Sequence, residues 1–393
     1  MRRVQRAVRD EAGMSLVFVG MGLMAFLSAS MLAIDVGMLM TARNQAQNSA
    51  DAGALAGATA LLYDSYDDHT SGGPAVTSAI TAGLANQVMG SNVSVTPADV
   101  QFLPDSTGEV NRVRVTVYRR ASRGNPLSTL IARYFGMPTA DIAAIATAEA
   151  SPANAMTCVK PFTIPDRWKE VGSDAPWNGD SVYDAFDNKG VPLPASEADV
   201  YIPAYYPGTT TPNPDYTGYN NVKNKGQLLV LRAATGNNIN TSFYYSLSMT
   251  DDMGGDDYRW NIANCNKSIY KWGDALVQEP GAMEGPTVQG AEELVARDPG
   301  AHWDDGTDTV VGSAFGTHSP RVFPIPLYDP QYYDEGKRNG RNASLITANW
   351  IGFFLESVVG NGIYGRIIPI AGIRDKNGPQ GSAAFPLAIR LVQ

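Results

Sequence analysis

The sequence predicts an α+β protein. It begins with one membrane-spanning helix, continues as a long alanine-rich helix into a small antiparallel sheet, and ends in a β-rich domain with many loops. Residues 12–34 contain no charged residue, which is typical of a membrane span. Alanines recur at every fourth position over residues 42–58 and therefore share one helix face. Residues 110–118 alternate between apolar and polar side chains, as a half-buried strand does.

Composition limits the function classes that need to be considered. Only 18% of the 393 residues are charged, whereas glycine and proline contribute 39 and 25 residues, so the part after the first third is expected to be rich in strands and loops. The net charge is −9, and basic residues cluster only within the first nine positions. Nucleic-acid binding needs clustered Lys and Arg, so no nucleic-acid partner is predicted.

The uncharged stretch is long enough to cross a bilayer, which takes about 20 helical residues. The positive-inside rule places the N-terminus in the cytoplasm and everything after Asp35 outside it. A cleaved signal peptide is the competing interpretation, with Ala29 and Ser30 as weak cleavage-site material. A pilin-type leader cut after Gly13 would need Glu where Phe18 stands. The basic residues that set the orientation are Arg2, Arg3, Arg6 and Arg9 before the span, and Arg43 alone shortly after it.

The helical pattern continues beyond the span without a proline until Pro74. Methyl groups at every fourth position make a flat surface that another element can approach closely, and polar residues such as Asp51 occupy other faces. Two interpretations stay open: the alanine stripe packs on its own domain, or it packs on partner subunits at the membrane. The stripe consists of Ala42, Ala46, Ala50, Ala54 and Ala58.

The same segment resembles a known family. An apolar span closes on Asp35-Val36-Gly37, Arg43 follows, and residues 45–58 read QAQNSADAGALAGA. This order is similar to the N-terminal signature of TadG-like and TadE-like proteins of tight-adherence (Tad/Flp) pilus assembly, with Ser49 and Gly53 as small departures. The resemblance makes Asp35, Gly37, Arg43, Asp51, Gly57 and the alanine stripe candidate binding or packing residues.

The remainder divides near residue 150. A helix is expected over residues 75–89, strands near residues 100–102 and 110–118, and a second helix over residues 126–135, while residues 140–150 fit either a strand or a helix. By analogy with pilins, the long helix and this sheet form a small pilin-like domain. The predicted domains are 1–11, a basic cytoplasmic tail; 12–34, the transmembrane helix; 35–150, the alanine-rich helix with the pilin-like α+β domain; and 151–393, a β-rich extracytoplasmic domain.

Chemistry-bearing residues are few. Cys158 and Cys265 are predicted to form a disulfide because the topology puts both in an oxidising compartment, with two separate buried thiols as the alternative. No cofactor is predicted, and none of the three histidines stands in a catalytic motif. A solvated acidic loop is preferred over a calcium site for Asp251, Asp252, Asp256 and Asp257.

The sequence therefore predicts a non-enzymatic, single-pass protein of the bacterial inner membrane whose bulk is periplasmic or extracellular. The resemblance implies that its partners are other subunits of the pilus or its secretion channel, and self-association stays open. An adhesin is the alternative. A hydrolase, with His302 or His318 beside a carboxylate and a serine, is the least favoured hypothesis.

Overall fold

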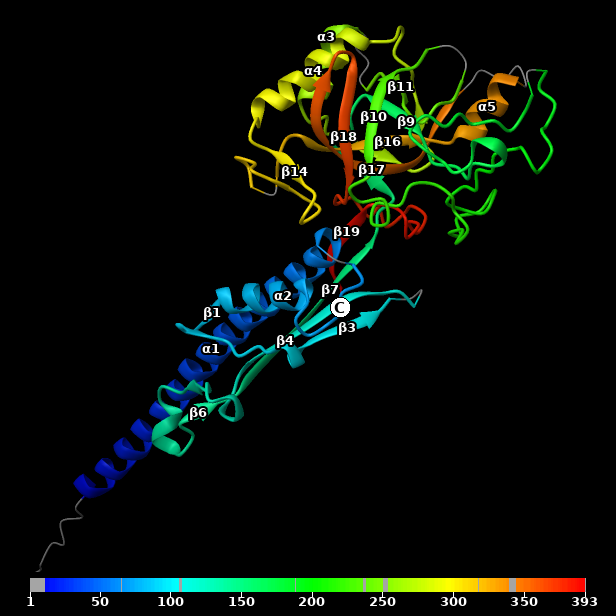
Figure 1. Cartoon of the computed structure of the whole chain (residues 1–393). Helices are drawn as coiled ribbons and strands as arrows, with labels where there is room; N and C mark the ends of the chain where they lie inside the picture. The colour runs from blue at the N-terminus through cyan, green and yellow to red at the C-terminus, as the bar shows by residue number, and fades with distance from the viewer. Residues whose placement is uncertain are drawn as a thin grey trace, which may run out of the picture. The chain divides into compact units, whose positions relative to one another are not determined.

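The computed structural model describes residues 11–392 except 65, 106–107, 188, 236–237, 250–253, 317 and 339–343. The chain divides into two compact units. The N-terminal unit comprises Met1–Glu149 together with Arg390–Gln393, and the C-terminal unit comprises Ala150–Ile389. In Figure 1 the first unit runs from blue to teal, with its C-terminal residues in red, and the second unit runs from green through yellow and orange to red.

One continuous helix, α1 (Glu11–Tyr63), forms the spine of the N-terminal unit. Its first half is apolar and exposed, with Leu16 at 75% and Met24 at 72%. Its second half packs on α2 (Pro74–Ala85) and on β4 (Val110–Arg119). Among the described residues, α1 is the one helix long and apolar enough to cross a membrane.

A four-stranded sheet, in the order β19-β7-β4-β3, lies against α1. Burial alternates along β4 as the sequence predicts, with Val113, Val115 and Val117 fully buried. Of residues 140–150, which fitted a strand or a helix, Ala140 ends the short strand β6 and residues 142–150 lie in the long strand β7, and β3, β4 and β7 pair antiparallel. The bounds are β3 Val100–Pro104, β7 Ile142–Pro152 and β19 Leu387–Val392, and two short strands, β1 Gln87–Val88 and β2 Ser91–Asn92, follow α2.

The helix predicted over residues 126–135 is wrong. Two short strands, β5 (Leu127–Ser128) and β6 (Thr139–Ala140), pair with each other, and the segment between them forms a single 3-10 turn, η3 (Ala132–Phe135). Gly136 ends that turn at φ 86°, a conformation that glycine adopts without strain. The pairing of β5 with β6 requires extended backbone at Leu127 and Ser128, which excludes an α-helix that begins at residue 126.

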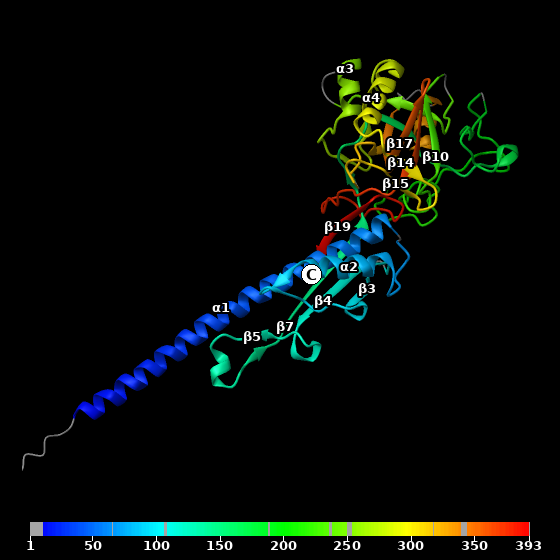
Figure 2. The ribbon, with the colours of Figure 1, turned by 60° about the vertical axis from the view of Figure 1, so that its left-hand side comes forward.

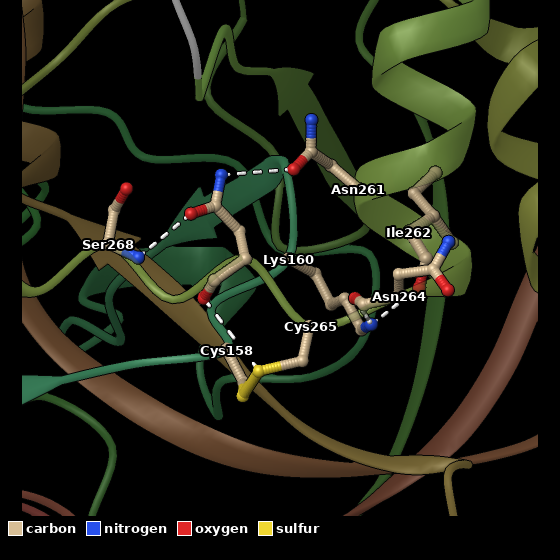
Figure 3. Close-up of a disulfide and its surroundings, with 8 residues drawn as sticks. Cys158, Lys160, Asn261, Ile262, Asn264, Cys265 and Ser268 are labelled. Atoms are coloured by element: carbon tan, nitrogen blue, oxygen red, sulfur yellow. Dashed lines mark hydrogen bonds between the residues drawn. A yellow bond between two sulfur atoms is a disulfide. The ribbon is translucent and has the colours of Figure 1, made fainter.

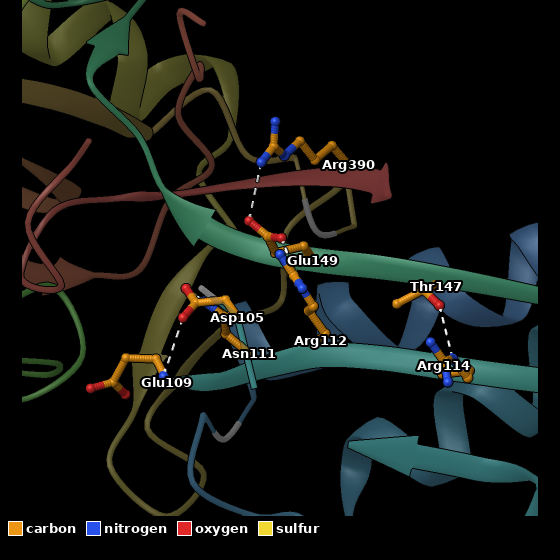
Figure 4. A network of polar contacts seen from close by, with 8 residues as sticks. All are labelled: Asp105, Glu109, Asn111, Arg112, Arg114, Thr147, Glu149 and Arg390. Carbon is orange, nitrogen blue, oxygen red and sulfur yellow. Dashed lines mark hydrogen bonds and ion pairs between the residues drawn. The ribbon is translucent and has the colours of Figure 1, made fainter. Parts of the chain in front are cut away.

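A buried carboxylate holds three strands of this sheet together (Figure 4). Glu149 on β7, whose side chain is 4% exposed, pairs with Arg112 Nε of β4 at 2.8 Å and with Arg390 Nη2 of β19 at 3.2 Å. Two arginines on one carboxylate satisfy both oxygens, as a buried charge requires. The pairing fixes the order of β19, β7 and β4 at this end of the sheet.

The C-terminal unit contains a closed barrel. Six strands follow one another as β17-β16-β9-β11-β10-β18, and β18 pairs back to β17, while β13 continues from β17 outside the ring. Closure leaves the ring without free edges. The strands are β9 Phe162–Pro165, β10 Leu228–Ala233, β11 Phe243–Ser246, β13 Ala275–Leu276, β16 Val322–Tyr328, β17 Leu345–Val359 and β18 Gly362–Ile368.

The barrel core is aliphatic and aromatic, and two helices extend it. Phe162, Ile325 and Phe353 from three different strands are almost fully buried, and Tyr258 of α3 and Leu294 of α4 belong to the same cluster. Figure 2 shows α3 and α4 stacked at one side of the barrel strands. The remaining bounds are α3 Gly255–Ala263, α4 Glu284–Arg297, α5 Pro330–Arg338, β8 Ala155–Met156, β12 Tyr270–Lys271, β14 His302–Asp304 and β15 Thr309–Val311.

Candidate functional site

The alanine stripe of α1 is buried inside the N-terminal unit. Each of its members is at most 1% exposed, because α2 and β4 cover this face. The stripe therefore packs on its own domain, and the structure offers no support for partner contact through it. Its members are Ala42, Ala46, Ala50, Ala54 and Ala58.

Two glycines on the same helix allow the close approach of α2 and β4. A methyl group added at Gly57 would lie 2.8 Å from Val113 Cγ1, and one added at Gly53 would lie 2.9 Å from the carbonyl oxygen of Ala79. Real side chains essentially never come so near. Both small residues of the family-like block are thus required by packing within the unit.

Polar side chains of the 45–58 segment of α1 form hydrogen bonds with other parts of the N-terminal unit. Gln45 Oε1 accepts the N–H of Met89 at 2.8 Å, and Gln47 Nε2 donates to the carbonyl of Ile145 on β7 at 3.0 Å and to Asp51 Oδ1 at 2.8 Å. Ser49 Oγ donates to the Gly83 carbonyl of α2. These contacts fix the rotation of α1 about its own axis and its position along that axis relative to the rest of the unit.

Asp35 fastens the end of the apolar stretch to a distant segment. Its Oδ1 accepts the N–H of Leu130 at 2.8 Å, and its Oδ2 accepts the N–H groups of Ile131 at 3.1 Å and Ala132 at 2.6 Å. Burial by itself would raise the pKa of the Asp35 carboxyl. The hydrogen bonds from the three N–H groups have the larger effect, so the pKa lies below its ordinary value. Asp35 thereby caps the 3-10 turn η3 from another part of the chain. Local sequence gives no signal for this contact.

The opposite face of α1 is exposed just beyond Asp35. Met40 is 65% exposed, Arg43 and Asn44 are exposed, and an added methyl group at Gly37 would meet no atom within 4 Å. Asn48 continues this face one turn further. Of the α1 residues that the family resemblance singled out, Gly37 and Arg43 are exposed, and Asp51 is half-buried.

The predicted disulfide between Cys158 and Cys265 is present (Figure 3). It joins the chain before β9 to the segment after α3. Nearby, Lys160 Nζ donates to the carbonyls of Ile262 and Asn264 at the C-terminal end of α3, where a cation is favoured. Burial and the neighbouring charge of Arg297 lower the pKa of Lys160 to about 7.

The acidic cluster considered for calcium is only half described. Asp251 and Asp252 lie outside the described residues. Asp256 and Asp257 stand in the first turn of α3, where Asp257 Oδ2 accepts from Asn261 Nδ2 at 3.0 Å, and acidic residues are favoured at a helix start. Within the described part of the chain, no group of three metal-binding side chains comes together.

The serine that follows His318 belongs to a buried polar network. Ser319 Oγ donates to Asp298 Oδ2 at 2.6 Å, and the same oxygen accepts from Ser313 Oγ at 2.7 Å. Arg321 donates to the backbone oxygens of Asp298 and Ala301. Asp298 and Arg321 are almost fully buried, so the network pins a loop of the C-terminal unit. His302 is exposed, and its Nδ1 lies 2.9 Å from the Gly300 carbonyl oxygen.

The first half of α1 is apolar and exposed and continues into the buried second half that packs within the N-terminal unit, so α1 is a candidate membrane span. The family model described as "Putative Flp pilus-assembly TadE/G-like" matches residues 13–60, which is nearly the whole of α1. The match confirms the resemblance seen in the sequence over this segment. No curated protein and no solved structure matches the chain.

Proposed function

We propose that the chain is a non-enzymatic component of Tad/Flp-type pilus assembly or the associated secretion machinery, anchored in the inner membrane by the first half of α1. One observation carries the proposal. The residues matched by the pilus-assembly model are a single helix, exposed and apolar at one end and docked into a folded unit at the other. In this role the continuous helix α1 holds the folded part of the N-terminal unit at a fixed distance from the membrane. The long helix packed on a four-stranded sheet supports the pilin-like expectation.

The proposed orientation is N-terminus in, bulk out. More arginines precede the span than follow shortly after it, and the positive-inside rule places the flank with more basic residues in the cytoplasm. The Cys158–Cys265 disulfide supports the same orientation, because disulfides persist in the periplasm and are rare in the cytosol. The C-terminal unit and the part of the N-terminal unit that follows the span then lie on the extracytoplasmic side.

Partner contact is assigned to the exposed face of α1 rather than to the alanine stripe. Met40, Arg43 and Asn44 lie one to three turns beyond the apolar span, so a pilus or channel subunit at the membrane surface could reach them. A flexible apolar side chain beside a guanidinium and an amide is a surface that can adapt to another helix.

The experiment combines a surface variant with a core variant. Arg43→Glu together with Met40→Gln should abolish pilus formation while the protein level in the membrane stays normal. Ala46→Leu, on the buried face, should instead lower the protein level, since overpacking costs about 1–3 kcal/mol. Normal piliation of the surface variant would contradict the assigned face.

A fusion tests the orientation separately. A reporter enzyme active only in the periplasm, placed after Gln393, should be active, and activity of a cytoplasmic reporter at the same position would contradict the orientation. Release of the mature chain from the membrane fraction would favour the adhesin alternative.

A further inference from the structure

The loop between β5 and β6 is apolar and exposed. Leu130 is 54% exposed, Tyr134 74%, Phe135 57% and Met137 55%, although each belongs to a class of side chain that is normally at least partly covered. Arg133 is the single charged residue between β5 and β6. The loop, residues 129–138, therefore presents four large apolar side chains and one cation on a short, tightly turned segment.

Asp35 determines where this loop lies. Its carboxylate holds the N–H groups of Leu130, Ile131 and Ala132, so the loop is tied to the turn of α1 at which the apolar stretch ends. Ile34 and Val36 on either side of Asp35 are themselves exposed. In Figures 1 and 2 the β5–β6 hairpin lies beside the blue part of α1 and points along the helix toward its N-terminal end.

We propose that the 129–138 loop is a second membrane contact, which inserts its apolar side chains at the boundary between lipid headgroups and acyl chains on the extracytoplasmic side. The proposal rests on the proposed function, in which the first half of α1 crosses that bilayer. A loop tied to Asp35 and directed along the span reaches the level of the membrane surface. The exposed apolar surface of the loop is then continuous with that of the helix.

The chemistry of the loop fits the membrane interface better than it fits water. Aromatic rings with polar tips concentrate at the headgroup level, and Tyr134 provides one such ring. The adjacent ring of Phe135 is wholly apolar and suits the acyl-chain side of the boundary. Arg133 Nη2 donates to the Tyr134 hydroxyl at 3.0 Å, and its guanidinium lies 5.0 Å from the centre of the same ring. A cation held over a ring can face phosphate while the ring faces acyl chains. The residues between β5 and β6 include no acidic side chain that anionic lipids would repel.

Two contacts fix the protein more firmly than one. The span alone leaves α1 free to tilt and rotate in the bilayer, whereas an interfacial loop on one side of the helix restricts both motions. The exposed face that carries Met40 and Arg43 would then point in a constant direction along the membrane surface. A component that must meet other subunits in the membrane plane benefits from such an orientation.

The test places a fluorophore on the full-length protein in nanodiscs that contain anionic lipid. Both cysteines of the chain are in the disulfide, so one introduced cysteine is the sole thiol available for an environment-sensitive dye. Phe135→Cys reports on the loop and Phe26→Cys on the span. Thr77→Cys on α2 is the exposed control, because α2 packs near Gly53, about 27 Å further along α1 than Asp35 at 1.5 Å per residue.

Quenchers attached to lipid at a shallow or a deep position of the acyl chain, and a water-soluble quencher, are added in turn. We expect shallow lipid quencher to reduce emission at position 135, deep quencher to reduce emission at position 26, and only the soluble quencher to reduce emission at position 77. Lipid quenching at position 26 with position 135 behaving like position 77 overturns the loop proposal alone. Loss of lipid quenching at position 26 overturns the proposed span instead. Protection of position 135 from every quencher would mean that protein covers the loop, and this result also overturns the proposal.

Discussion

Asp35 is the residue at which the exposed half of α1 meets the folded N-terminal unit. Its three backbone donors come from residues at least 95 positions away, so the contact joins two segments of the unit that are far apart in the sequence. Asp35→Ala removes all three acceptor bonds, and hydrogen exchange at the amides of Leu130, Ile131 and Ala132 should become several-fold faster. Gly37→Ala, on the exposed face of the same turn, is the control and should leave these amides protected. Unchanged exchange in Asp35→Ala would show that the cap contributes nothing to the loop.

The same contact has a pH dependence with a definite sign. The N–H donors lower the pKa of the Asp35 carboxyl below its ordinary value of 3.8 in the folded protein. A lowered folded-state pKa contributes stability that is fully present above 3.8 and is lost as the pH falls through the folded value. Protection of the Ile131 amide should therefore be constant near neutrality and decrease only in strong acid. A decrease already at pH 6 would point to another group.

Lys160 gives a pH effect in the C-terminal unit. Its folded pKa of about 7 lies below its ordinary 10.5, so between these values the unfolded chain binds the extra proton and stability rises with pH. Lys160→Met should remove this slope, and it should cost about 1–3 kcal/mol because the carbonyls of Ile262 and Asn264 lose their donor. Urea unfolding at pH 6.5 and pH 9.5 measures both effects. An identical slope in the two proteins would contradict the assignment.

At the scale of elements, α1 and its glycines allow a matched comparison. Gly57→Ala places a methyl group 2.8 Å from Val113 Cγ1, and the overpacking should cost about 1–3 kcal/mol, partly offset by a helix-propensity gain of up to about 1 kcal/mol. Gly37→Ala has the same propensity gain and no contact within 4 Å, so it should be neutral or slightly stabilising. Thermal unfolding of the two detergent-solubilised variants measures the difference. Equal effects would mean that α2 and β4 shift freely to accommodate the methyl group.

Local pattern predicted the elements whose identity depends on neighbours in the sequence. The uncharged run and the alanine period predicted α1, and strict alternation predicted β4. The 126–135 segment was misassigned because its apolar content suggests a helix, whereas its conformation depends on Asp35 and on the pairing of Leu127 with Ala140. The sequence shows that the alanines share one helix face, but it does not show which elements pack on that face. These elements are α2 and a strand further along the chain.

The barrel and the orienting loop depend on still longer separations. Ring closure brings β10 against β18, with Leu229 opposite Gly365, and no local period encodes that register. The sequence shows that the 129–138 loop is rich in apolar residues, but it shows neither their exposure nor the hydrogen bonds to Asp35 that hold the loop at α1. The sequence therefore predicts the helix that carries the candidate site but not the 129–138 loop beside it.

At the scale of the whole molecule, the Cys158–Cys265 disulfide affects the free energy of unfolding of the C-terminal unit, and it forms only in an oxidising compartment. The two cysteines are 107 positions apart, and closing a loop of that length should stabilise the C-terminal unit by about 4–5 kcal/mol in the chain-entropy model. A Cys158→Ala, Cys265→Ala variant should therefore unfold its C-terminal unit at lower urea. The N-terminal unit contains no cysteine and should keep its own transition.

In protein taken from cells without reductant and unfolded in the presence of a thiol reagent, neither cysteine should be labelled, because the proposed orientation exposes both to an oxidising compartment. Full labelling of both, together with unchanged urea unfolding of the double variant, would contradict both the bond and the orientation that it supports.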